Sequence, residues 1–261
     1  MNASQPVLAL CARWAGLLIA TLLLSACITT TEGGFTEKAD PKEALELRVE
    51  LARKYIGEGD WENAKRNLKM AYEMDPNNAE VHEAFALVYQ STGEFELAEQ
   101  SYKTAIRLNR GFSRARNNYA AFLYSQARYR EAAEQLEYVV KDSLYQARPQ
   151  AFVNLGLCRE QLFESAAAEQ AFMRALTMDR TNSIALLELA VLRYEAEDYP
   201  TAGKYYGTYR TVVRQQSARG LWLGIRLARA NGDADAEASY ALALANLYPE
   251  SAEYQAYKRT Q

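Results

Sequence analysis

Apolar residues recur with a helical period along residues 43–261, and short polar turns interrupt them at regular intervals. The same arrangement of small and large apolar residues returns every 34 residues, in six stretches at 45–78, 79–112, 113–146, 149–182, 183–216 and 217–250. Each stretch predicts two helices, A and B. Gly59 and Gly93 mark a helix stop near the middle, and Pro76 and Pro249 mark the end of helix B. The chain is therefore predicted to be all-α.

Positions 8, 20 and 27 of each stretch are kept small. Sixteen of these eighteen positions hold Ala or Gly, about four times as many as the composition would supply by chance. A small residue at the crossing of helices A and B lets the backbones approach to the roughly 8–10 Å of tight helix packing. Larger residues at positions 7, 11 and 24 fill the space beside the crossing. We expect residues 251–261 to form a short helix that caps the last repeat.

This spacing resembles the tetratricopeptide repeat (TPR). The resemblance implies that residues 43–250 form a right-handed superhelical solenoid of six TPR helix pairs.

Residues 1–26 have the anatomy of a secretory signal peptide. Arg13 precedes an apolar run over residues 14–24, which is too short to span a bilayer comfortably. The run ends in Leu24-Ser25-Ala26-Cys27, which resembles the lipobox of bacterial lipoproteins. We expect cleavage before Cys27 and acyl chains such as palmitate on its thiol. The alternative is an ordinary signal peptide with a chance cysteine.

The residue after Cys27 is Ile28 rather than Asp. By resemblance to lipoproteins of Gram-negative bacteria, this favours the periplasmic face of the outer membrane. Residues 27–42 show no apolar period and contain Gly33-Gly34, so we expect a lipidated cysteine followed by a flexible tether. Cys158 lies in an apolar helical pattern and is expected to be a buried small side chain.

Charge and motifs exclude several functions. The formal net charge is −3, from 30 basic and 33 acidic residues, so no overall cationic field would hold nucleic acid. The single histidine, His82, falls on a packing position of helix A, and the chain has no P-loop, GxGxxG or HExxH motif. We predict a protein that is not an enzyme and has no metal site, no cofactor and no small-molecule substrate.

The candidate binding surface is the groove lined by the A helices, which positions 2, 5, 6, 9, 12 and 13 of each repeat should face. A groove of this kind is the usual binding surface of solenoids and suits peptide capture by hydrogen bonds and apolar pockets. Ordinary solvated lining is the alternative for any single residue. The candidate groove residues are Val49, Arg53, Ile56, Glu83, Leu87, Arg114, Asn117, Asn118, Tyr124 and Asn154. In other TPR domains, asparagine at the position of Asn118 and Asn154 can hold a peptide backbone.

The lipobox, the short tether, the first repeat from Tyr55 to Pro76 and the string Ala115–Leu123 together resemble one family. This is the type IV pilus biogenesis and stability family PilF/PilW, the secretin pilotins. Ala120 departs from the glycine that is common there. The resemblance implies a chaperone that binds the pilus secretin subunit, carries it to the outer membrane and promotes its multimerisation. Pilus assembly and twitching motility would depend on it.

We expect the groove of repeats 1 to 3 to hold the secretin segment. An alternative function is a TPR lipoprotein adaptor for cell-wall hydrolases or for outer-membrane protein assembly.

Overall fold

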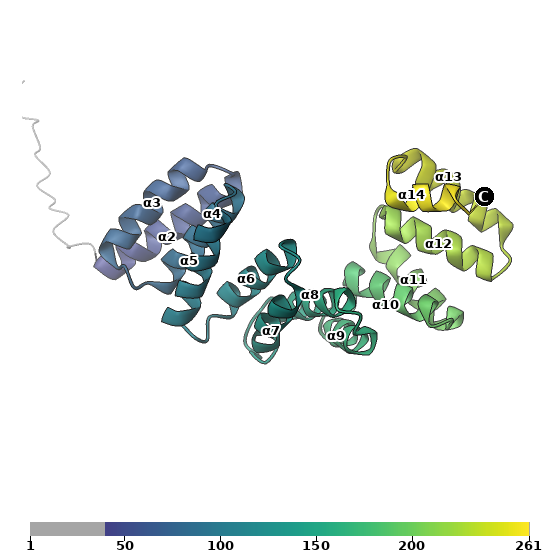
Figure 1. The fold of residues 1–261 in the computed structure, drawn as a ribbon, viewed down its shortest axis with the longest axis horizontal. Coiled ribbons are helices and arrows are strands. Elements are labelled where there is room, and N and C mark those ends of the chain that lie inside the picture. The colour runs from purple at the N-terminus through teal and green to yellow at the C-terminus, as the bar shows by residue number, and fades with distance from the viewer. Residues whose placement is uncertain (1–39, 261) are drawn as a thin grey trace, which may run out of the picture. The chain divides into compact units, whose positions relative to one another are not determined.

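The computed structural model describes residues 40–260, and within that range the chain forms thirteen α-helices and no strand (Figure 1). The all-α prediction is confirmed. The predictions for residues 1–39, which include the signal peptide, lipidation of Cys27 and most of the tether, lie outside the described residues.

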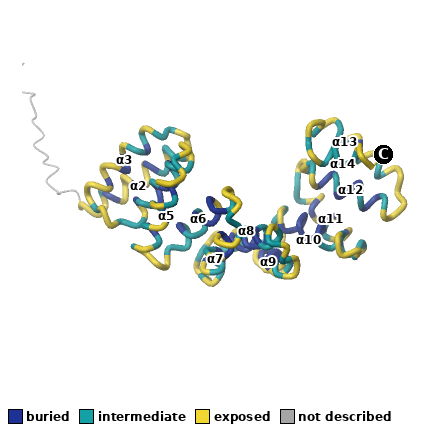
Figure 2. Tube along the Cα trace, in the orientation of Figure 1, coloured by how far each residue is buried: buried dark blue, intermediate teal, exposed yellow. Residues whose placement is uncertain are grey.

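Twelve of these helices form six consecutive pairs, each joined by a short turn. The pairs are α2 (Pro41–Glu58) with α3 (Trp61–Met74), α4 (Ala79–Ser91) with α5 (Phe95–Leu108), α6 (Ser113–Ser125) with α7 (Tyr129–Val139), α8 (Arg148–Gln161) with α9 (Ser165–Met178), α10 (Ser183–Glu195) with α11 (Tyr199–Val212), and α12 (Ala218–Ala230) with α13 (Ala234–Leu247). A short helix, α14 (Ala252–Lys258), follows and packs on α12 and α13. Buried segments line the faces between helices, while the turns are exposed (Figure 2).

The helix starts differ in three places from the even spacing of the repeats, and one of these is α8, which begins at Arg148, one residue before its repeat. Helix α2 begins at Pro41, inside the stretch 27–42 assigned to the tether, because proline suits a first helical turn and Asp40 accepts a hydrogen bond from the Lys42 backbone at 2.9 Å. Helix α12 begins at Ala218 with Ser217 as its N-cap. Helices α4, α6 and α10 start at the first residue of their repeat, so the loop after α11 has one residue more than the loops before these three helices.

Each turn between helices A and B contains one residue with a left-handed backbone. Gly59, Gly93 and Gly232 adopt it with φ values of 74°, 82° and 69°. In the other three pairs a residue with a side chain does so: Ala127, Phe163 and Glu197, with φ between 57° and 60°. The geometry of the turn is thus fixed by the helix pair even where glycine is absent.

The helix crossings explain why small residues are needed. In the fourth pair, Phe172 is fully buried, and a Cβ at Gly156 would lie 2.5 Å from its Cε1 atom. In the fifth pair, position 27 is the large residue Tyr209. A Cβ at Gly220, on the next A helix, would lie 2.6 Å from the Tyr209 hydroxyl oxygen. A glycine on the neighbouring helix therefore makes room for a large residue at a normally small position.

Leu51 corrects one part of the packing prediction. It occupies position 7 of the first repeat but is 36% exposed, whereas Tyr119, Leu155 and Leu189 at the same position are buried. Tyr119 packs against Tyr102 of the preceding B helix, with ring centroids 5.5 Å apart. Within residues 40–260, no B helix precedes α2, so Leu51 has no such neighbour.

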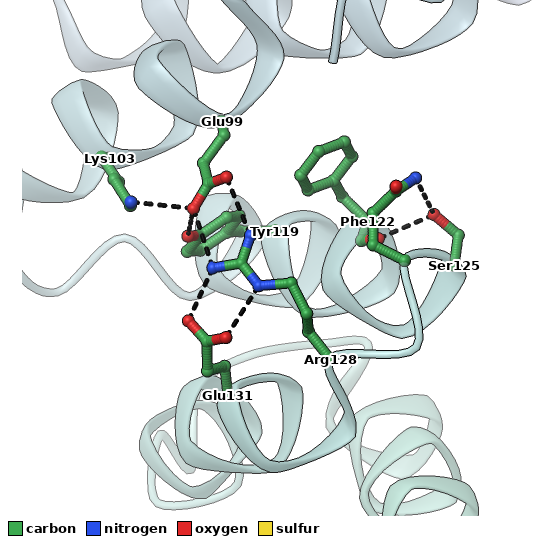
Figure 3. A network of polar contacts seen from close by, with 8 residues as sticks. Glu99, Lys103, Tyr119, Phe122, Ser125, Arg128 and Glu131 are labelled. Atoms are coloured by element: carbon green, nitrogen blue, oxygen red, sulfur yellow. Dashed lines mark hydrogen bonds and ion pairs between the residues drawn. The ribbon is translucent and has the colours of Figure 1, made fainter. Parts of the chain in front are cut away.

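A polar clamp joins the second and third pairs (Figure 3). Arg128, just before α7, donates two hydrogen bonds to Glu99 of α5, at 2.8 and 2.9 Å, and also pairs with Glu131. The Tyr119 hydroxyl of α6 donates to Glu99 at 2.9 Å, and Lys103 lies 2.8 Å away. The hydrogen bonds from Arg128 are the main cause that lowers the pKa of Glu99 to about 2. This clamp ties α5 of the second pair to α6 and to the turn before α7 of the third pair.

Candidate binding groove

A buried carboxylate organises the groove formed by α2, α4 and α6. Glu83 of α4 is completely buried, and Arg53 of α2 pairs with it at 2.5 Å. The side-chain amide of Asn118, on α6, donates a hydrogen bond to the other carboxylate oxygen of Glu83 at 2.6 Å. The Nε atom of Arg114 lies 3.8 Å from the Glu83 oxygen that Arg53 contacts. A carboxylate removed from water needs such partners, because an unpaired buried charge is strongly destabilising. Three consecutive A helices are thereby tied together.

The same arginines reach a second carboxylate at the surface. Glu80 of α4 lies 2.9 Å from Arg114 and 3.5 Å from Arg53. These groups border a hollow of about 290 Å³, whose other lining residues include Leu45, Val49 and Asn78. The hollow has an apolar floor, and Arg53, Glu80 and Arg114 at its edge are paired with one another.

The structure places the sequence-predicted groove residues in three environments. Arg53, Glu83, Arg114 and Asn118 belong to the ion-pair network. Val49 is 4% exposed and packs in a buried cluster with Leu45, Ala71 and Val81, while Ile56 and Leu87 are partly buried against neighbouring clusters. Asn117, Tyr124 and Asn154 lie further along the groove.

The structure corrects the expectation that the Glu83 carboxylate is available to a partner. We expected its carboxylate to be offered to a partner, but both of its oxygens are engaged by residues of the chain itself. It is a structural residue of the groove, and contact of the other candidates with a partner stays a prediction.

A second hollow of about 120 Å³ lies between α6 and α8. It is lined by Ala120, Ala121, Tyr124, Leu136, Asn154, Leu157 and Cys158, and its surface is largely apolar. The Asn154 amide lies 3.4 Å from the Asn117 oxygen, which gives the hollow a polar edge. Burial raises the pKa of the Cys158 thiol to about 12, so this thiol stays protonated near neutral pH.

Sequence reasoning missed a charged cluster in the groove of the last three repeats. Arg219 of α12 holds Glu188 of α10 through Nε at 3.0 and 3.1 Å and through Nη2 at 2.5 Å. Burial, and next the nearby Glu188, raise the pKa of Glu160 in α8 to about 7. The rule for groove positions would have found Glu188, at position 6 of the fifth repeat, had it been extended beyond the fourth.

None of the helices described in residues 40–260 is long and apolar enough to cross a membrane.

The sequence and the architecture are similar to those of known tetratricopeptide repeat proteins. The tetratricopeptide repeat family model matches residues 79–112 and 149–182. The type IV pilus assembly protein PilF of Pseudomonas aeruginosa strain PAO1 is 38% identical over 237 residues, which cover 90% of this chain and 93% of that protein.

Two solved structures are similar. One, from the functional characterisation of Pseudomonas aeruginosa PilF, has a TM-score of 0.80 and 38% identity, covering 85% of this chain and 99% of that one. The other is PilW, described as a widely conserved type IV pilus biogenesis factor, with a TM-score of 0.71 and 26% identity, covering 82% and 98%.

Proposed function

This chain belongs to the PilF/PilW family of tetratricopeptide repeat proteins, and we propose that it acts in type IV pilus biogenesis. The observation that carries the proposal is the match to a pilus assembly protein along nearly the whole of both chains. The family consists of binding scaffolds and not enzymes. The function is therefore to bind a protein partner.

The partner is the secretin subunit, and the protein carries it to the outer membrane. The lipobox-like Leu24-Ser25-Ala26-Cys27 supports an acyl anchor on Cys27 at the periplasmic face of that membrane. Two linked modules, a lipid and a groove, suffice, because tethering raises the local concentration of captured secretin at the bilayer. Secretin rings would then assemble where the anchor holds their subunits, and pilus assembly and twitching motility would follow.

The secretin segment binds in the groove of the first three repeats. The features that support this are the hollow floored by Leu45 and Val49 and the apolar hollow beside Tyr124. Because Arg53 and Arg114 are already paired with Glu80 and Glu83, the contribution of a partner would come mainly from apolar side chains that fill these hollows.

The anchor is tested by Cys27→Ala in cells that make the secretin. Cys27 precedes the helical repeats, so the soluble variant should persist in the periplasm while secretin rings disappear from the outer membrane. Normal rings with Cys27→Ala would refute the role of the anchor. Capture of a cell-wall hydrolase instead of secretin by the wild-type protein would favour the adaptor alternative.

The groove is tested by a matched pair of substitutions. Ala121 is exposed on α6 beside the apolar hollow, and Ala166 is exposed on α9, away from that hollow. Both replace alanine by arginine on a helix, so their effects on folding should be similar. Ala121→Arg should abolish secretin capture and ring assembly, and Ala166→Arg should preserve both. Equal secretin capture by the two variants would place the secretin segment elsewhere.

A further inference from the structure

The C-terminal part of the groove contains an arginine that no carboxylate within residues 40–260 neutralises by contact. The guanidinium carbon of Arg226, on α12, lies 4.6 Å from the ring centroid of Tyr194 and 5.7 Å from that of Trp222. Its Nε is buried without a hydrogen-bond partner. No residue in the range 40–260 makes a hydrogen bond or an ion pair with its guanidinium. Two aromatic side chains therefore hold a cation whose hydrogen-bond donors are unused.

The other groove arginines behave differently. Arg53, Arg114 and Arg219 each pair with a glutamate on a neighbouring A helix. Arg53 reaches forward to Glu83 on the next A helix. Helix α12 is the last A helix in the described range. The helix after its partner α13 is α14, which places Tyr257 edge-on against Trp222 at 6.5 Å. Arg226 thus lacks the following carboxylate that Arg53 has.

Nearby carboxylates do not fill this role. Glu188 is occupied by Arg219. Glu195 is near enough to act electrostatically on Arg226 but makes no ion pair with it. The buried Nε of Arg226 shows that the site is partly shielded from water, and this burial is the main cause that lowers the pKa of Arg226. A charge–charge hydrogen bond formed in such a place is stronger than one at an open surface.

The position of the guanidinium over the Tyr194 ring selects the geometry of the ligand. A guanidinium that lies on ring faces presents its N–H groups along its edge, and this arrangement suits the two oxygens of a carboxylate. The same rings can bury an apolar side chain next to that carboxylate. We propose that Arg226, Tyr194 and Trp222 form a second binding site, which takes an aspartate or glutamate side chain flanked by apolar residues in an extended segment of a protein partner.

A polyanion such as nucleic acid fits this surface poorly. Glu160, Glu188 and Glu195 lie around Arg219 in the same part of the groove, and their charges would repel successive phosphates. One acidic side chain at Arg226 adds a single negative charge to this part of the groove, whereas a polyanion would add several. This site is separate from the hollows assigned to the secretin segment, so it can succeed or fail independently of the proposed function.

The site is tested with two pools of fluorescein-labelled pentapeptides, amidated at the C-terminus and carrying a fixed central residue. In one pool the centre is Glu and in the other Gln, with the same mixture of uncharged residues around it. Fluorescence polarisation with the full-length lipidated protein in detergent should show about tenfold tighter binding of the Glu pool, the scale of one charged hydrogen-bonded pair. Arg226→Gln should remove this preference.

Arg174→Gln is the matched control. Arg174, on α9, also lies near an aromatic ring, 5.8 Å from the Phe152 centroid, but its side chain is exposed. This variant should keep the full preference for the Glu pool, and the thermal midpoints of both variants should match that of the wild type. Equal binding of the two pools by the wild type, or an unchanged preference in Arg226→Gln, would overturn the proposal. A third pool has Gln at the centre and a free C-terminal carboxylate. If only this pool bound more tightly, the proposal would also be overturned, because Arg226 would then bind the C-terminal carboxylate of a chain.

Discussion

Gly156→Ala is the sharpest test of how the helix pairs pack. Gly156 lies on α8 where that helix crosses α9. An added Cβ would lie 2.5, 2.7 and 2.7 Å from the Cε1, Cδ1 and Cζ atoms of Phe172. Carbon atoms in favourable contact are roughly 3.5–4.0 Å apart. Phe172 has no exposed surface, so its ring has no open space into which to move.

The expected free-energy change combines two opposing effects. Replacing a helical glycine by alanine favours the helix by about 1 kcal/mol. Overpacking a tight core costs about 1–3 kcal/mol, and three contacts this short with a fully buried ring call for the upper end. Gly156→Ala should therefore lower the free energy of unfolding by about 2 kcal/mol.

Gly207→Ala provides the control of opposite sign. Gly207 is an exposed residue of α11, and a Cβ there would meet no atom within 4 Å. Only the helix effect remains, so this variant should be more stable by about 1 kcal/mol. Urea unfolding followed by far-UV circular dichroism measures both. If Gly156→Ala were as stabilising as Gly207→Ala, the close approach of α8 and α9 would be wrong. Adding Phe172→Leu to Gly156→Ala should recover part of the loss.

Three further predictions concern single side chains. Because the pKa of Glu160 is raised to about 7, its ionised form opposes folding. Glu160→Gln should therefore leave the free energy of unfolding unchanged near pH 4 and raise it by about 1–3 kcal/mol at pH 8. If urea unfolding at pH 8 gave the variant and the wild type the same stability, the raised pKa would be contradicted. Phe163 combines a φ of 60° with 93% exposure. Phe163→Gly should relieve the strain, raise the free energy of unfolding by about 0.5–1 kcal/mol and so raise the thermal midpoint of unfolding. A lowered midpoint would reveal a stabilising contact of the Phe163 side chain. Cys158, whose pKa is about 12, should resist iodoacetamide at pH 8 until the protein is unfolded in urea, as mass spectrometry of its peptide would show.

The fold could be predicted from the sequence because it depends on local, repeated signals. Alanine at a crossing and glycine at a turn recur at fixed spacing, and each acts mainly on its own helix pair. The departures come from contacts between repeats. Nothing about Leu51 itself shows that no B helix precedes it within residues 40–260, and nothing about Tyr209 shows that Gly220 will make room for it.

The groove was harder to predict because position alone does not give the state of a side chain. The repeat register indicates that Glu83 and Arg53 face the groove, but only the structure shows that they pair and that Glu83 is closed to solvent. Arg226 shows the reverse. Its position suggests an ion pair like that of Arg53, but the next A helix and its carboxylate are absent from the described residues.

Paired and unpaired charges should make the two parts of the groove respond differently to salt. Displacing Arg53 from buried Glu83 would cost about 3–5 kcal/mol, so a partner in the first three repeats should leave that pair intact and bind through apolar contacts. Its affinity should change little between about 0.1 and 1 M NaCl, where the screening length falls from about 10 to 3 Å. Binding of the Glu-centred peptides at Arg226 uses a new charge pair and should weaken over the same range. A secretin segment whose affinity fell as steeply as that of the peptides would show that it opens the Glu83 network or binds at Arg226.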